Sequence, residues 1–149
     1  LDDRIDVVAT DHAPHTVEEK SGKYFSAPSG GPLVQHGLPA MLDLVHQGVI
    51  SVERVVELMS HRVAECFQLE NRGYIREGYQ ADLVLVNPDA AWTVTGENIL
   101  YKCGWSPFTG HEFKSHVVGT WVNGTRVWNG VNILTENGNH AGQRLAFNR

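Results

Sequence analysis

The residues best suited to chemistry lie close together near the start of the chain. Asp11, His12 and His15 fall within five positions, and Pro14 stands between the two histidines. A carboxylate can bind a divalent metal ion or accept a proton, and imidazole nitrogens can do the same. Because Pro14 has a fixed φ angle, it stiffens the loop and helps to direct His15. The spacing predicts a metal or acid–base site and leaves open which of the two it is.

An apolar segment comes directly before this cluster. Residues 5–9 are rich in β-branched side chains and almost continuously apolar, which predicts a buried strand of a parallel sheet. Asp11 would then follow the carboxyl end of the strand, where α/β barrels and open sheets carry their chemistry. An aspartate in this position can also simply cap the next turn, so position alone does not assign it a function.

The elements after the cluster change from helical to extended. Residues 16–36 predict a long loop with a helical turn at 18–20, and helices are expected at 38–45, 52–59 and 61–69. Gly48 is expected to end the first of these helices and Ser51 to cap the second, with Cys66 in the core of the third.

Short strands are expected from Gly73 onward. They cover residues 73–75, 80–86 and 92–94, followed by a hairpin of 116–122 and 125–128 around Asn123-Gly124. The polar segment 132–149 predicts a poorly ordered tail. The predicted organisation is therefore a strand-and-helix part (1–72), a β part (73–131) and a tail (132–149).

Composition excludes several classes of protein. The chain has 149 residues, 42% of them hydrophobic and 19% charged, with a net charge of −5. These values are typical of a globular protein, and the acidic balance argues against a nucleic-acid partner. No apolar run approaches the roughly 20 residues of a membrane span. The two cysteines make neither a disulfide framework nor a structural zinc site, which fits a reducing cytoplasm.

Several motifs resemble one enzyme family. The run from Ala9 to Thr16 with Glu18-Glu19-Lys20 resembles the last barrel-strand motif of dihydroorotases, which belong to the amidohydrolase superfamily. The stretches 73–86 and 102–110 resemble, in order, the return of the chain into the small β-domain and the segment before the last hairpin. The similarity covers roughly residues 5–130, and its Asp-x-Ala-Pro-His core is the most specific part.

The resemblance implies a fold of class α/β. The chain would be the C-terminal part of a (β/α)₈ TIM barrel, with its last strand and following helices, plus strands of a small β-sandwich domain. One barrel strand cannot close a barrel of about 250 residues, so we expect the chain to be a fragment of a longer protein. Alone it is expected to bind metal weakly, to be inactive, and to self-associate or fold poorly.

The resemblance also implies a reaction, the reversible conversion of N-carbamoyl-L-aspartate to L-dihydroorotate in pyrimidine biosynthesis. One or two zinc ions would serve as cofactor, with ligands outside this chain and Asp11 as the ligand within it. Asp11 would also shuttle a proton to the amide nitrogen, and His15 would hold the substrate carboxylate. The loop 31–37, with Gly31, Pro32 and Gly37, would contact the substrate through its backbone, although its spacing differs from the family pattern.

Two alternatives remain open at this point. One is a related hydrolase of the allantoinase or dihydropyrimidinase type, although His15 favours a substrate with a carboxylate. The other is a non-catalytic dihydroorotase-like subunit that scaffolds a partner such as aspartate transcarbamoylase. As an enzyme, the parent protein is expected to be a cytoplasmic homo-oligomer that acts on a small molecule, without nucleic-acid or membrane partners, and with aspartate transcarbamoylase as a possible associate.

Overall fold

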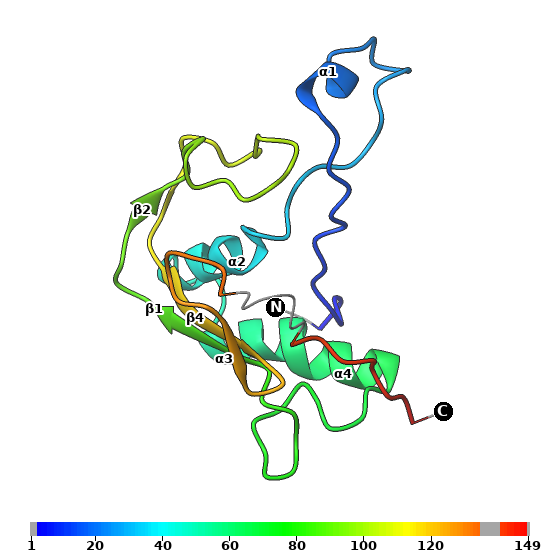
Figure 1. Ribbon diagram of the computed structural model, residues 1–149, viewed down its shortest axis with the longest axis vertical. Coiled ribbons are helices and arrows are strands. Elements are labelled where there is room, and N and C mark those ends of the chain that lie inside the picture. Colours follow the sequence, from blue (N-terminus) through cyan, green and yellow to red (C-terminus); the bar gives the residue numbers. More distant parts are fainter. Residues whose placement is uncertain (1–2, 135–140, 149) are drawn as a thin grey trace.

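Helices come first and strands second, as the sequence predicts for the part of the chain after residue 16. The computed structural model describes residues 3–134 and 141–148. Its helices are α1 (Val17–Lys20), α2 (Gly37–His46), α3 (Val52–Val56), η1 (Glu57–His61) and α4 (Arg62–Phe67). Its strands are β1 (Leu83–Asn87), β2 (Trp92–Thr93), β3 (Glu112–Phe113), β4 (His116–Val122) and β5 (Thr125–Trp128). In Figure 1, α1 and the loop after it project at one end, and α3–α4 lie at the other.

The helix α2 lies within one residue of its predicted bounds. The Leu42 side chain of this helix is buried and faces the rest of the protein. The helix is followed by Gly48, which has a φ of +70° and whose amide donates to the carbonyl of Val45 at 2.9 Å. Glycine adopts this left-handed conformation without steric cost, so the prediction of Gly48 as a helix stop is confirmed.

The next two predicted helices are one continuous helix, so the predicted break between them is wrong. Ser51 caps it as predicted, because its hydroxyl accepts a hydrogen bond from the amide of Arg54 at 3.2 Å. Helix α3 then passes through the single π-helical turn η1 directly into α4. The prediction of Cys66 as a core residue is also wrong: Cys66 is exposed, and the buried residue of α4 is Ala64.

A close approach explains why Ala64 is buried. A Cβ on Gly73 would lie 2.5 Å from the Cβ of Ala64, and Gly73 has a φ of +82°. The turn after α4 therefore lies directly on this helix face. No described element covers the face that carries Cys66 in the same way.

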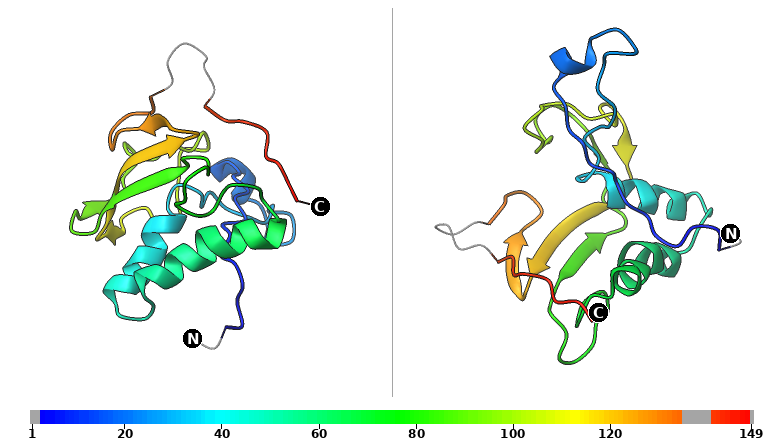
Figure 2. Two further views of the ribbon diagram at one scale, coloured as in Figure 1. Left: turned by 90° about the horizontal axis from the view of Figure 1, so that it is seen from below. Right: turned by 90° about the vertical axis from the view of Figure 1, so that its right-hand side faces the viewer.

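The hairpin is the best-predicted part of the β region. Strands β1, β4 and β5 form an antiparallel sheet in the order β1-β4-β5, with β4 in the centre. Its tight turn consists of Asn123 and Gly124, at φ angles of 48° and 81°. Positive φ at both central residues is the signature of a type I′ turn, so the sequence prediction is confirmed. Figure 2 shows β4 between β1 and β5.

A second, two-stranded sheet holds the best-buried part of the core. Trp92 of β2 pairs with Phe113 of β3, and the predicted extension around 92–94 is confirmed for the first two residues. Phe113 is fully buried and Val94 is 1% exposed. These side chains, with the end of the loop before α2, join the helical and β parts.

Two predicted strands are absent from the structure, and a third is shifted. Residues 5–9 are extended but belong to no strand, and Ile5 is 62% exposed. The backbone contact given for this segment is from the Val8 amide to the Leu58 carbonyl, at 3.1 Å. A strand needs neighbours to pair with, and the described residues supply none beside this segment. Residues 73–75 form a bend with Ile75 90% exposed, and the strand expected at 80–86 is β1, Leu83–Asn87.

Part of the expected loose tail returns to the helical part. Within 141–148, the Ala146 carbonyl accepts from the Glu70 amide at 3.0 Å, and the Asn148 amide donates to Gln68 at 2.9 Å. Residues 135–140 and 149 of the predicted tail lie outside the described residues. No helix in the described part of the chain is long and apolar enough to cross a membrane.

Candidate active site

Asp11 stands where the extended N-terminal segment turns. It has a φ of +44°, which is uncommon for a residue other than glycine and marks a position worth a functional explanation. Its side chain is exposed, and no hydrogen bond to its carboxylate is found within the described residues. The carboxylate is therefore available to a ligand rather than used as a cap of the next turn.

The motif loop, residues 12–16, lies against the glycine-rich loop, residues 30–37. The Ala13 amide donates to the Gly31 carbonyl at 3.2 Å, and His12 and Gly31 form a parallel bridge. Gly30 has a φ of +89°, and a Cβ there would lie 2.5 Å from the Cβ of Ala13. The structure thus brings together the two segments that the sequence assigns to one site.

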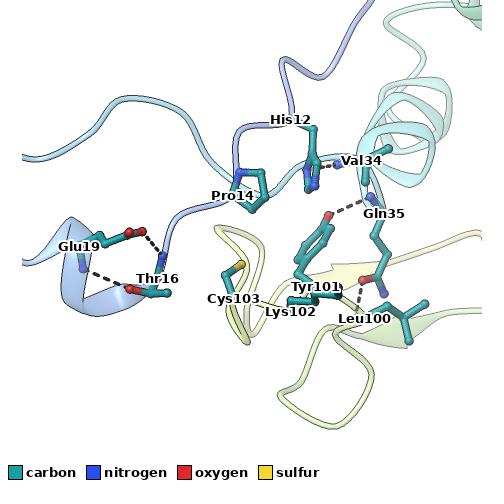
Figure 3. A pocket seen from close by; sticks show the side chains of 10 residues that line it. All are labelled: His12, Pro14, Thr16, Glu19, Val34, Gln35, Leu100, Tyr101, Lys102 and Cys103. Atoms are coloured by element: carbon teal, nitrogen blue, oxygen red, sulfur yellow. Dashed lines mark hydrogen bonds between the residues drawn. The ribbon is translucent and has the colours of Figure 1, made fainter.

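The His12 side chain connects these two loops by hydrogen bonds. Its Nδ1 accepts hydrogen bonds from the amides of Leu33 at 3.1 Å and Val34 at 3.3 Å. Nδ1 therefore carries no proton in this arrangement. Figure 3 shows the His12 ring directed at the backbone of Val34. His12 therefore holds the glycine-rich loop in place, a role that its spacing in the sequence does not reveal.

The other predicted loop residues differ in their surroundings, and Gly37 lies closest to the segment before Asp11. Pro32 is buried, whereas a Cβ on Gly31 would meet only open space. Gly37 begins α2, and a Cβ there would lie 2.7 Å from the methyl group of Thr10. The residue before Asp11 can therefore lie against the first turn of α2 only because position 37 is glycine.

His15 is held at both its backbone and its ring. Its carbonyl accepts a hydrogen bond from the indole nitrogen of Trp105 at 2.7 Å, across 90 positions of sequence. Its Nδ1 lies 3.3 Å from a carboxylate oxygen of Glu19, one turn along, and the side chain is 33% exposed. A polar ring with one nitrogen held and part of its surface open is suited to contact a ligand.

A pocket of about 700 Å³ opens beside this motif. Neither Asp11 nor His15 is among its lining residues, which come from the motif loop, the segment before α2 and the segment 100–103: His12, Pro14, Thr16, Glu19, Val34, Gln35, Leu100, Tyr101, Lys102 and Cys103. Figure 3 shows Tyr101 and Cys103 approaching the motif loop from the β part. The first two residues of the segment 102–110, which carries part of the family resemblance, therefore belong to one wall of the pocket.

A buried histidine joins this wall to the glycine-rich loop, a role that spacing in the sequence does not reveal. His36 is fully buried among aromatic rings, with its ring stacked on Phe113 at 5.8 Å between centroids. Its Nδ1 lies 3.0 Å from the Ser106 hydroxyl and 3.3 Å from the Tyr101 hydroxyl, while its Nε2 has no partner among the described residues. Burial lowers the pKa of His36 and raises the pKa of Tyr101, because each loses solvation of its charged form. His36 therefore has a structural role, because it links the segment before α2 to Tyr101 and Ser106.

The described residues do not supply a complete set of ligands for a metal ion. Within residues 3–134 and 141–148, no group of three or more His, Cys, Asp or Glu side chains could hold a metal ion. Asp11 could serve as one ligand, since its carboxylate is exposed and forms no hydrogen bond with the described residues. A metal ion at Asp11 would need its other ligands from elsewhere.

The sequence profile of the amidohydrolase family matches residues 2–127, which include the motif loop, the glycine-rich loop and all of both sheets except Trp128. The chain belongs to the amidohydrolase family. Members of this family that resemble it include the dihydroorotase of Halobacterium salinarum, 44% identical over 95% of this chain, and that of Pyrococcus furiosus, 33% identical over 96%. The chain spans about a third of the length of each of these relatives, 33% in both cases.

Solved structures of amidohydrolases confirm that the fold is shared. The D-hydantoinase (dihydropyrimidinase) of a Thermus species matches with a TM-score of 0.83 and 25% identity, over 90% of this chain and 30% of that one. The L-hydantoinase (dihydropyrimidinase) of Arthrobacter aurescens matches with a TM-score of 0.80 and 32% identity, over 89% and 30%. Predicted membership of this superfamily is therefore confirmed, although the described residues alone form no closed barrel.

Proposed function

We propose that this chain supplies part of the active site of a zinc-dependent dihydroorotase. The observation that carries the proposal is the Asp11–His15 motif, folded against the loop 30–37 in a chain 44% identical to a dihydroorotase. In this proposal residues 5–10 are the last barrel strand. Their extended and unpaired backbone fits a segment whose neighbours lie outside this chain.

Asp11 would bind zinc and move a proton. Zinc, when bound, lowers the pKa of water to about 7 and polarises a carbonyl group. The exposed Asp11 carboxylate would take the proton that this water releases and would deliver it to the amide nitrogen as the ring opens. In ring closure, Asp11 would accept a proton from the attacking nitrogen.

His15 and the loop would orient the substrate. The half-exposed ring of His15 would donate to the carboxylate of dihydroorotate or carbamoyl aspartate. Backbone groups around Gly31, Pro32 and Gly37 would contact the ring amide, and His12 would keep this loop in register with Asp11. The proposal therefore assigns orientation to His15 and the loop, and proton transfer to Asp11.

A specific observation favours a second candidate. The two structural neighbours described above are hydantoinases, so a cyclic amide without a carboxylate is an alternative substrate. This chain is 44% and 33% identical to the two dihydroorotases, and 25% and 32% identical to these two hydantoinases. Because the highest of these identities is to a dihydroorotase, we prefer dihydroorotate as the substrate. A non-catalytic subunit is the third possibility, although the available carboxylate of Asp11 argues against it.

The remaining sequence predictions belong to the same proposal. They are the division into 1–72, 73–131 and 132–149, one or two zinc ions, a cytoplasmic location, a homo-oligomer, and an association with aspartate transcarbamoylase. The antiparallel sheet β1-β4-β5 supports a separate β part, since it lies outside the helical segment 37–67.

The decisive experiment measures interconversion of dihydroorotate and carbamoyl aspartate by the complete protein that carries this chain, supplied with zinc. We expect turnover in the wild type and a loss of at least about a thousandfold in Asp11→Asn, which keeps the shape but not the charge. Absence of turnover together with absence of bound metal would support the non-catalytic subunit. Turnover of dihydrouracil or a hydantoin in place of dihydroorotate would move the proposal to the second candidate.

A further inference from the structure

The contact between His15 and Glu19 does more than close a helical turn. One carboxylate oxygen of Glu19 lies 3.3 Å from Nδ1 of His15 and accepts the amide of Thr16 at 2.9 Å. The Thr16 hydroxyl accepts the Glu19 amide in return, which makes a complete capping box at the start of α1. The carboxylate is thus fixed by the backbone, and it fixes the histidine ring in turn.

Stability does not explain this ion pair. Glu19 is 55% exposed and His15 is 33% exposed, and exposed pairs of this kind contribute little to folding. The backbone of His15 is already anchored by Trp105. The ring contact therefore adds orientation to a residue whose backbone is held independently.

The pair also decides which ring nitrogen is available. A carboxylate can only accept, so Nδ1 facing Glu19 carries a proton, and Nε2 is left for a ligand. A ring that also donates from Nε2 carries both protons and a positive charge, which Glu19 balances. Other charged side chains nearby are Lys102, which lines the pocket, and Lys20, which is engaged by the carbonyls of Pro28 and Gly30.

We propose that Glu19 is a positioning residue that holds His15 as a charged donor for a carboxylate, and thereby makes the site selective for cyclic amides that carry one. A charged donor forms stronger hydrogen bonds with a carboxylate than a neutral one. A substrate without a carboxylate gains nothing from the arrangement. This inference rests on the proposed function and names the residue behind its substrate preference.

The test compares two substrates that differ only in this group. Dihydroorotate is dihydrouracil with an added carboxylate, so both are supplied to the complete zinc-loaded protein. Glu19→Gln keeps an oxygen that can complete the capping box but removes the charge. Glu18→Gln is the matched control, because Glu18 lies in the same helical turn and its carboxylate interacts with Thr16 and not with His15.

We expect Glu19→Gln to raise KM for dihydroorotate about tenfold, with kcat changed by less than about twofold. Its kcat/KM for dihydrouracil, and both substrates in Glu18→Gln, should stay within about twofold of the wild type. Equal behaviour of the two variants overturns the inference. Equal losses on both substrates also overturn it, because they would show that Glu19 acts only on the structure.

A second readout separates this inference from the proposed function. In protein labelled with ¹⁵N-histidine, both ring nitrogens of His15 should carry a proton in the wild type, and Glu19→Gln at the same pH should show a larger share of neutral ring. An unchanged protonation pattern in the variant contradicts the inference whatever the activity. A wild type without dihydroorotate turnover contradicts the proposed function, and the ring signals then decide on Glu19 by themselves.

Discussion

Gly37 and Thr10 approach so closely that a Cβ on Gly37 would lie 2.7 Å from the Thr10 methyl group. This distance is shorter than real Cβ contacts allow, so the first turn of α2 and the end of the extended segment meet only at a glycine. Asp11 follows Thr10 directly, and its direction therefore depends on this contact.

Gly37→Ala should push the two segments apart. We expect a loss of about 1–3 kcal/mol in the free energy of unfolding, the usual cost of overpacking, together with reduced turnover. Urea denaturation of the complete protein measures the first and the dihydroorotate assay the second. Gly96→Ala is the control, since an added Cβ there meets nothing within 4 Å and no positive φ is involved. Identical unfolding of the two variants would contradict this account.

Lys20 should hold the loop that follows α1. Its Nζ donates to the carbonyls of Pro28 at 2.6 Å and Gly30 at 2.9 Å, which closes the loop at its base. Lys20→Met removes both bonds and should speed limited proteolysis within residues 21–30 by about threefold to tenfold, since the loop opens more often. Lys23→Met, in the same loop, is the control because the Lys23 ammonium has no hydrogen-bond partner among the described residues. Equal cleavage rates would rule out the proposed closure.

Trp105 should support substrate binding, because it holds the backbone of His15, which lies 90 positions earlier in the sequence. Trp105→Phe keeps an aromatic ring but removes the indole donor that holds the His15 carbonyl. The net value of such a bond is about 1 kcal/mol, which corresponds to a rise of about fivefold in KM for dihydroorotate. Trp128→Phe loses an indole donor to Val117 within the hairpin and should leave KM unchanged. A rise of the same size in both variants would refute a specific effect on His15.

Stability should fall in mildly acidic solution because of His36. Burial lowers the pKa of His36 in the folded protein, whereas the unfolded chain keeps a value of about 6.5. Below that pH the unfolded state binds more protons than the folded state, so the free energy of unfolding decreases as pH falls. One such group contributes a slope of up to about 1.4 kcal/mol per pH unit.

His36→Asn provides the comparison, because its amide oxygen can take the place of Nδ1 opposite Ser106 but does not titrate. Urea denaturation between pH 7 and 5 should show a shallower loss of stability in the variant than in the wild type. Parallel curves for the two proteins would exclude His36 as the source.

The sequence predicted what depends on near neighbours along the chain. The cap at Ser51, the stop at Gly48 and the Asn123-Gly124 turn each follow from a side chain or φ angle acting within four residues. The same holds for the helical turn at 18–20 and for helix α2. Predictions failed where an element needs distant partners, as for residues 5–9, which have the composition of a strand but no neighbour among the described residues.

The candidate site divides in the same way. The sequence alone determined the motif Asp11 to His15 and the family to which it belongs, because residue types and spacing are enough to recognise both. Only the tertiary structure decided that His12 holds the glycine-rich loop, that Trp105 anchors His15 and that His36 is buried. These contacts join residues 21 to 90 positions apart. Packing brings such residues together, and no local preference of the backbone encodes it.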